Sequence, residues 1–367
     1  MKKISFKFAL LALAVSAFVA CDDENSSNNV AKDVYWSGDV KISAPVVIES
    51  GATLTIEAGT NVTAEDNGEH IYILIAQGAK IDAQGTAAEP IIMTAEDKSE
   101  GAWGGIHICG YATVNTGSNS SEVGSYPYGG SKDDDNSGVL SYVVIEYAGY
   151  LHSAEKEANG FTFYGVGSGT QVDHCVAYKG ADDGFEWFGG TVNGTYLVSI
   201  GNQDDAFDWT EGWKGAAQFL IADQIQNGCD QTIEGDNSKV SYLLEPISCP
   251  TIVNATLIGD DNGSDTSGAL LRNGTYFKIY NTIASGKSTD IRISDVSTEK
   301  ADSTNVGTYP TSASLEAASS LFKNVYTGSY KDDKTTSSYT FDGVNGNSVV
   351  SQAAYDYATT VASSSHG

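Results

Sequence analysis

Carboxylates and tryptophans recur together over two stretches of the chain. The residues with binding potential are Asp182, Asp183, Glu186, Trp187, Asp204, Asp205, Asp208, Trp209, Glu211 and Trp213. The first four recur as the next four at a constant offset of 22 residues (182 to 204, 183 to 205, 186 to 208, 187 to 209). A constant offset indicates a repeating backbone that sets equivalent side chains one above another.

Stacking of these two stretches would bring their carboxylates together, with a repulsion of about 1 kcal/mol or more that depends on the effective dielectric. A hard cation offsets such repulsion, and calcium suits an irregular site because it takes about six to eight oxygen ligands. We expect Asp183, Asp205 and Asp208 to be the ligands. Two alternatives remain open: the carboxyls have raised pKa values, or they face solvent or bond the amides of turns.

The tryptophans among these acids favour a carbohydrate ligand. Flat aromatic surface beside hydrogen-bonding carboxylates suits a neutral glycan, so an exposed tryptophan here would provide a platform for sugar rings. Large aromatic side chains are also frequent in cores, and at least some of these residues are expected to be buried.

An enzymatic function is the second hypothesis, because paired aspartates resemble the acid and base of polygalacturonase-like hydrolases. No Gly-His-Gly follows the aspartates, and Arg292-Ile293-Ser294 lacks the lysine of an Arg-x-Lys clamp. A pectate-lyase-like site would need a cationic base, yet Arg272 and Arg292, the only arginines, are distant in sequence. We therefore assign no catalytic residue and favour a non-catalytic function.

The elements that must position these residues are short β-strands. Runs rich in Val, Ile, Tyr and Thr lie between glycines at residues 139–147, 172–178, 195–200, 216–221, 252–258 and 276–283. Taking His174, Leu197, Phe219, Asn254 and Asn281 as equivalent gives steps of 23, 22, 35 and 27 residues. Steps of this length indicate a solenoid, so we expect an all-β, parallel β-helix, with a β-sandwich as the alternative.

Two consequences follow for single residues. Asn254 and Asn281 are expected to stack and to bond through their amides, and His174, at the same position of an earlier coil, is interpreted as structural. Cys229 and Cys249 are 20 residues apart, close to one expected coil, which predicts a disulfide between neighbouring coils.

The first residues resemble an export signal. Lys2, Lys3 and Lys7 precede an apolar run over residues 8–19, which is too short to span a hydrocarbon core of about 30 Å but suits a secretory signal. The run ends at Cys21, in a sequence that resembles a bacterial lipobox. Acylation of Cys21 would anchor the protein to a membrane without a transmembrane helix.

Composition limits the partners. The formal charge is 20 − 47 = −27, and hydrophobic residues make up 41% of the 367. Phosphate binding needs clustered positive charge, so nucleic acid is not expected as a partner. A cation, or a glycan or other surface ligand, fits this composition better.

Several phrases resemble one known family. They are GATLTIEAGT at 51–60, GAKIDAQGT at 78–86, PIIMT at 90–94, WGGI at 103–106, IEYAG at 145–149, DDGFE at 182–186, FGGTV at 188–192 and GALLR at 268–272. In this order they resemble the coils of Bacteroidetes-type surface lipoproteins with a right-handed parallel β-helix. The resemblance covers roughly residues 38–295, and it implies lipid anchoring and surface exposure at the outer membrane.

The sequence thus predicts four segments: a lipoprotein signal peptide at 1–20, an acylated cysteine and flexible tether at 21–37, a parallel β-helix at 38–300 and a C-terminal capping segment at 301–367. The predicted function is binding or adhesion to a glycan or another extracellular ligand. A polysaccharide lyase or hydrolase is one alternative. A structural surface protein that forms assemblies is the other.

Overall fold

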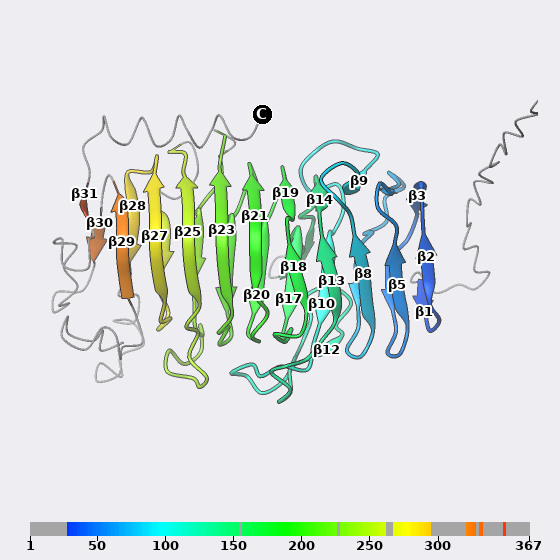
Figure 1. The fold of residues 1–367 in the computed structure, drawn as a ribbon, viewed down its shortest axis with the longest axis horizontal. Helices are drawn as coiled ribbons and strands as arrows, with labels where there is room; N and C mark the ends of the chain where they lie inside the picture. The colour runs from blue at the N-terminus through cyan, green and yellow to red at the C-terminus, as the bar shows by residue number, and fades with distance from the viewer. Residues whose placement is uncertain are drawn as a thin grey trace, which may run out of the picture.

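The chain winds into a parallel β-helix (Figure 1). The computed structural model describes residues 28–153, 156–225, 228–261, 267–294, 321–327, 330–332 and 348–349. All regular elements among them are strands, which confirms the all-β prediction. No helix of this part of the chain is long and apolar enough to cross a membrane.

One long sheet forms the first face of the solenoid. In spatial order its strands are β1 (Asn28–Val30), β4 (Val46–Ile48), β7 (Ile73–Ile75), β10 (Ile106–Cys109), β17 (Phe161–Tyr164), β20 (Phe185–Phe188), β22 (Phe207–Thr210), β24 (Ile233–Gly235), β26 (Ser267–Leu271), β28 (Thr289–Ile293) and β30 (Tyr330–Asp332). We call it the first sheet.

The second sheet forms the remaining faces. One side contains β2 (Val34–Trp36), β5 (Thr53–Ile56), β8 (Lys80–Gln84), β13 (Gly138–Ser141) and β18 (Gln171–Asp173); the other contains β3 (Asp39–Ile42), β6 (Asn61–Ala64), β9 (Ile91–Ala95), β14 (Val143–Glu146) and β19 (Val176–Tyr178). The two sides merge into β21 (Gly194–Ile200), β23 (Ala216–Asp223), β25 (Thr251–Ile258), β27 (Lys278–Ser285), β29 (Leu321–Thr327) and β31 (Ser348–Val349).

Every pairing within these two sheets is parallel; for example, β17, β20 and β22 pair in register. Parallel neighbours require a full coil between them, so the β-sandwich alternative is wrong. The paired residues Phe161, Phe185 and Phe207 are 24 and 22 positions apart. This spacing confirms that residues about two dozen apart in sequence lie on adjacent coils.

The expected ladder of equivalent residues is correct except at one position, where Tyr196 replaces Leu197. His174, Tyr196 and Phe219 all have φ between 52° and 59°, a left-handed bend within the second sheet, and their rings stack in sequence. The left-handed residue interrupts the alternation of inward and outward side chains, so Leu197, the next residue, turns into the core and pairs with Leu220.

The same ladder confirms the predicted contact between two asparagines and stacks the His174 ring between two tyrosines. The amide of Asn281 donates to Oδ1 of Asn254 at 3.1 Å. The His174 ring lies between Tyr142 and Tyr196, with centroid distances of 4.3 and 4.5 Å. This stacking on both faces fits the structural interpretation of His174.

The interior is filled by ladders whose members change from aliphatic to aromatic in the middle coils. The inward position of the first sheet is occupied in turn by Ile108, Phe163, Trp187 and Trp209. Trp187, Trp209 and Trp213 are at most 2% exposed. None of the three is exposed, so the platform expected of exposed tryptophans is not formed. Strand alternation turns Trp187 and Trp209 inward, and Trp213, which follows β22, stacks on Trp187 in the core with ring centroids 4.4 Å apart.

The parallel coils extend beyond the predicted bounds of 38–300. β1 and β2 lie within the segment predicted as a tether, and each pairs with a later strand. β29 and β31 lie within the predicted capping segment, yet they continue the second sheet. The signal peptide and Cys21 lie outside the described residues.

The predicted disulfide between Cys229 and Cys249 is not formed. The coil that contains them is longer than the others, because Ala217 pairs with Ile252, 35 positions later. Cys229 therefore precedes β24 and Cys249 follows it, on the two sides of a strand of the first sheet. A separation of 20 residues is little more than half of this coil, which explains why the prediction fails.

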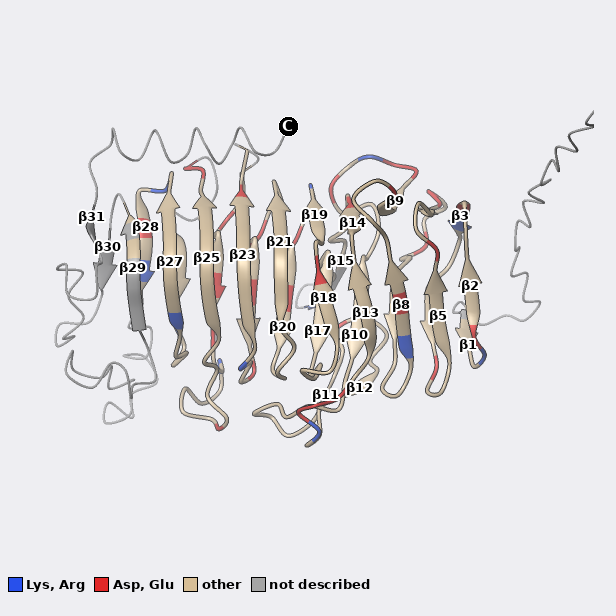
Figure 2. Ribbon diagram, viewed as in Figure 1, with Lys and Arg blue, Asp and Glu red and all other residues tan. Residues whose placement is uncertain are grey.

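Among the residues that the structure describes, two antiparallel hairpins interrupt the coils. The first pairs β11 (Asn119–Ser120) with β12 (Pro127–Tyr128), and the second pairs β15 (Leu151–Ser153) with β16 (Lys156–Glu157). The first hairpin packs on the first sheet: the Tyr128 ring lies 4.9 Å from that of Tyr164 and 6.4 Å from that of Phe188. The first hairpin follows β10 and the second follows β14, so both are inserted before β17, and Figure 2 labels β11, β12 and β15 beside the middle coils.

Candidate functional site: a carboxylate cage

Acidic residues form ladders along the outer side of the first sheet. Glu186 of β20 pairs with Asp208 of β22, which pairs with Glu234 of β24. On β20 the two neighbours of Glu186, Phe185 and Trp187, are buried in the core, so strand alternation turns Glu186 outward. Asp208 pairs with it in register, and Glu234 pairs with Asp208, so both lie on the same outer side. Figure 2 shows acidic segments on successive coils, and few basic ones.

Two further ladders come from the turns that lead into the same strands. Asp182 and Asp204 occupy one turn position in successive coils, and Asp183 and Asp205 occupy the next. Backbone bonds hold these turns in place, since Gly160 N donates to Asp183 O and Gly184 N donates to Asp205 O. The predicted stacking of carboxylate on carboxylate is therefore present.

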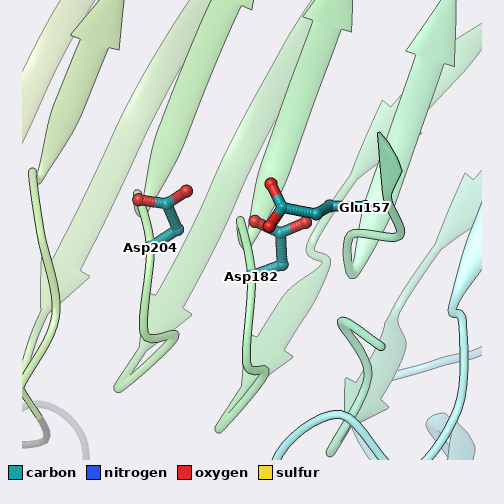
Figure 3. A group of neighbouring side chains, drawn as sticks. All are labelled: Glu157, Asp182 and Asp204. Atoms are coloured by element: carbon teal, nitrogen blue, oxygen red, sulfur yellow. The ribbon is translucent and has the colours of Figure 1, made fainter. Parts of the chain in front are cut away.

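Within the described part of the chain, carboxylate oxygens approach one another closely in three groups. Within each group, one oxygen per residue lies within 4.8 Å of the others; the groups are Glu157 with Asp182 and Asp204, Asp183 with Asp204 and Asp205, and Asp183 with Glu186 and Asp208. Figure 3 shows the first group: Glu157, from β16, lies over Asp182, and Asp204 lies on the next coil. The predicted ligands Asp183, Asp205 and Asp208 do not meet in one group, because Asp208 lies with Glu186 on the strands.

Some of these oxygens have backbone or amide partners. Asp183 Oδ1 accepts a hydrogen bond from the backbone N–H of Asp205 at 2.9 Å, and Asp205 Oδ1 accepts one from the backbone N–H of Gln231 at 2.7 Å. Each aspartate thus bonds the turn of the following coil, as the turn alternative predicted. Glu186 Oε2 accepts from Asn159 Nδ2 at 2.5 Å.

Two other oxygens are buried without a hydrogen-bond partner. They are Asp182 Oδ2 and Asp208 Oδ1. Asp182 is only 5% exposed. A buried polar atom left unpaired costs about 1–3 kcal/mol, and more if it is charged. Two such atoms within one acidic cluster indicate that the site is completed by protons or by a cation.

The pKa values of these carboxyls are raised. Burial is the largest cause for Asp182, Asp183, Glu186 and Asp205, and neighbouring acids add to it. Burial and the charge of Asp230 raise the pKa of Asp204 to about 6. Burial and Asp236 raise the pKa of Asp208 to about 7.

The two hairpins place further acidic residues beside the carboxylates of the first sheet and its turns. Glu122, which lies between β11 and β12, interacts electrostatically with Asp182 and Glu186, and burial followed by the charge of Glu157 raises its pKa to about 7. Glu157 is exposed. We call the following residues the carboxylate cage: Glu122, Glu157, Asp182, Asp183, Glu186, Asp204, Asp205 and Asp208.

One arginine lies at the edge of the cage. Arg272 bonds Glu234 and, through Nε at 3.0 Å, Asp236 Oδ1. The other oxygen of Asp236 accepts from Asn273 at 2.9 Å. The guanidinium is thus held by two acids one coil beyond Asp208, although its sequence position predicted no such proximity.

Glu211 has a different role from the one predicted. Its carboxylate accepts from the Tyr128 hydroxyl at 2.8 Å and from Asn119 Nδ2 at 3.0 Å. Both donors belong to the first hairpin. Glu211 therefore fastens that hairpin to the solenoid and is not part of the cage.

Sequence reasoning missed Glu122, Glu157, Glu234 and Arg272. Glu234 follows Asp208 by 26 residues, and a search that allowed unequal coils would have found it. Glu122 and Glu157 lie on hairpins outside the repeat, where no periodic signal exists.

The family comparison agrees with this architecture. A family model described as a pectate-lyase like beta helix domain matches residues 28–363. No curated protein and no solved structure matches the chain.

Proposed function

The chain belongs to the family of pectate-lyase-like β-helix domains, and we propose that it is a non-catalytic binding module that holds calcium in the carboxylate cage and binds a glycan through it. The unpartnered buried oxygen of Asp182 carries this proposal, because it lies among carboxylates whose spacing suits one hard cation. Calcium accepts such all-oxygen, irregular sites. A cation also relieves the repulsion among the acids.

A metal-mediated contact with the glycan fits the exposure of the side chains. Glu157 is exposed and Asp204 is half-buried, so an ion beside them would be open to solvent on one side. Calcium keeps coordination positions for water when the protein fills only part of its shell. Sugar hydroxyls or a uronate carboxylate would replace that water, without any need for an aromatic platform.

A hydrolase is the second candidate, and the pairing of Glu186 with Asp208 favours it. The two residues are strand neighbours in the cage, and general acid–base cleavage of a glycoside uses two carboxyls of which one is protonated. The raised pKa of Asp208, about 7 with burial as its main cause, suits the acid. Release of reducing sugar from a polysaccharide, lost in Asp208→Asn, would establish this function in place of binding.

Glycan arrays test the binding function directly. The purified protein should bind a subset of glycans in calcium and lose this binding in a chelator, and Asp182→Asn should lose it in both conditions. Asp134→Asn is the matched control, because Asp134 is an exposed aspartate outside the cage. Binding of equal strength with and without chelator would show that the cation has no part in it.

We also propose that the protein is exported and anchored by acylation at Cys21, and that it is exposed at the outer membrane. The lipobox-like residues before Cys21 support this address. Mass spectrometry of the N-terminal peptide should show acylated Cys21, and Cys21→Ala should be released from membranes. An unmodified N-terminus beginning at Met1 would contradict the proposal.

A further inference from the structure

We propose that the carboxylate cage holds two divalent cations in separate, adjacent sites. Site one is formed by Glu157, Asp182 and Asp204; site two is formed by Asp183, Glu186 and Asp208. This inference rests on the proposed cation binding and extends it, because one cation is sufficient for the function described above.

The spacing of the oxygens supports one ion in each site. Calcium–oxygen distances of about 2.3–2.6 Å allow two oxygens on the same ion to lie up to about 5 Å apart. In each site the three oxygens lie within 4.8 Å of one another. The two sites share no residue, so both sets of ligands can be used at the same time.

The unpartnered oxygens are divided between the sites. Asp182 Oδ2 belongs to site one, and Asp208 Oδ1 belongs to site two. Asp182 is a turn residue beneath the second hairpin, whereas Asp208 lies on β22. Each site therefore has its own buried carboxylate oxygen with no N–H or hydroxyl donor, and in each site a neighbouring carboxyl lies close enough to share a proton in place of an ion, Asp204 with Asp182 and Asp208 with Glu186.

A shared group of carboxylates connects the sites. Asp183 and Asp204 lie within 4.8 Å of each other and of Asp205. Asp204 is also a ligand of site one, and Asp183 is also a ligand of site two. Carboxylates placed in this way separate two like-charged ions and reduce their mutual repulsion. We expect the second ion to bind more weakly than the first, because some repulsion persists.

The balance of charge favours a second ion. The cage contains eight carboxyls, and one divalent ion would neutralise only a quarter of their charge if all eight were ionised, so protons or a second ion must offset the remainder. Arg272 forms ion pairs with Glu234 and Asp236, so its positive charge mainly offsets those two acids and not the acids of the cage. A second divalent ion brings the cage closer to neutrality.

Calorimetric titration with calcium alone tests the inference. Full-length protein stripped with a chelator is titrated at about pH 8, above the raised pKa values of Asp204 and Asp208. We expect two equivalents for the wild type and for the Asp134→Asn control. Asp182→Asn should retain one equivalent from site two, and Asp208→Asn should retain one from site one. Circular dichroism confirms that each variant is folded.

A terbium soak of wild-type crystals provides a second measurement, with two anomalous peaks expected, one beside Asp182 and one beside Asp208. A single equivalent in the wild type, or variants that each lose both equivalents or neither, would overturn the two-site inference. The glycan array is independent of this outcome. One equivalent with calcium-dependent glycan binding refutes only the second site, whereas two equivalents without glycan binding refute only the proposed function.

Discussion

Removal of one acid from the cage should stabilise the protein when no cation is present. Asp204→Asn is the most informative change, because the side chain is half-buried and burial, with Asp230, raises its pKa from 3.8 to about 6. Asparagine has nearly the same shape but no charge to desolvate. The variant should therefore be more stable than the wild type, although it loses a ligand of site one.

The size and pH dependence of this effect follow from the pKa shift. A rise of about two pKa units corresponds to roughly 3 kcal/mol between the protonated and ionised forms. The folded pKa lies above the unfolded one, so the folded state binds the proton more tightly. The wild type therefore loses stability as the pH rises from about 4 to about 6, and the loss persists at higher pH. The variant lacks this loss.

Denaturant unfolding of both proteins in chelator provides the measurement. The difference in unfolding free energy should be roughly 3 kcal/mol at about pH 8 in favour of the variant, and close to zero at about pH 4. Asp134→Asn controls for removal of one negative charge and should change stability by less than about 0.5 kcal/mol. In saturating calcium the order should reverse, because the ion stabilises only the state that binds it.

Two results would refute this reasoning. If Asp204→Asn were no more stable than the wild type at about pH 8, burial would impose no cost on the ionised carboxyl. If the gain were equal at both pH values, its cause would be packing and not charge. Either result would remove the electrostatic reason for a cation in the cage.

Three other changes test the fold and the corrected predictions. Trp209→Ala should lower the unfolding free energy by about 3–5 kcal/mol in denaturant, equally with and without calcium, because it empties a core position. Gly138→Ala should yield little soluble protein on expression, since φ is 118° and the new Cβ would lie 1.8 Å from the carbonyl oxygen of Ile81. A reducing agent should leave the melting temperature unchanged, because no disulfide joins Cys229 and Cys249.

Much of the solenoid could be predicted from the sequence because its cause is local. Runs of β-branched and aromatic residues between glycines set the strands, and turn-forming residues set the length of each coil. The hydrogen bond between the side-chain amides of Asn281 and Asn254 followed from that period alone. Where a coil was longer, as between Ala217 and Ile252, the assumption of equal steps failed, and the disulfide prediction failed with it.

The direction of side chains was harder to predict. A single left-handed residue, Tyr196, shifts the inward and outward alternation by one position. No composition rule marks this residue, since tyrosine has no preference for positive φ. The tryptophans were misassigned for a related reason: their types suit a core and a binding surface equally, and only the register of β20 and β22 turns Trp187 and Trp209 inward.

The amino-acid order by itself determined that Asp182 and Asp204 would lie one coil apart, because backbone pairing in a parallel solenoid depends only on the spacing of strands and turns. The tertiary structure alone decided that Glu122 and Glu157 would join them. Those two residues are placed by hairpins that pack through long-range contacts, such as Tyr128 on Tyr164 and Glu211. Contacts between segments so distant in sequence leave no period along the chain, so the cage became visible only once the coils and hairpins were assembled.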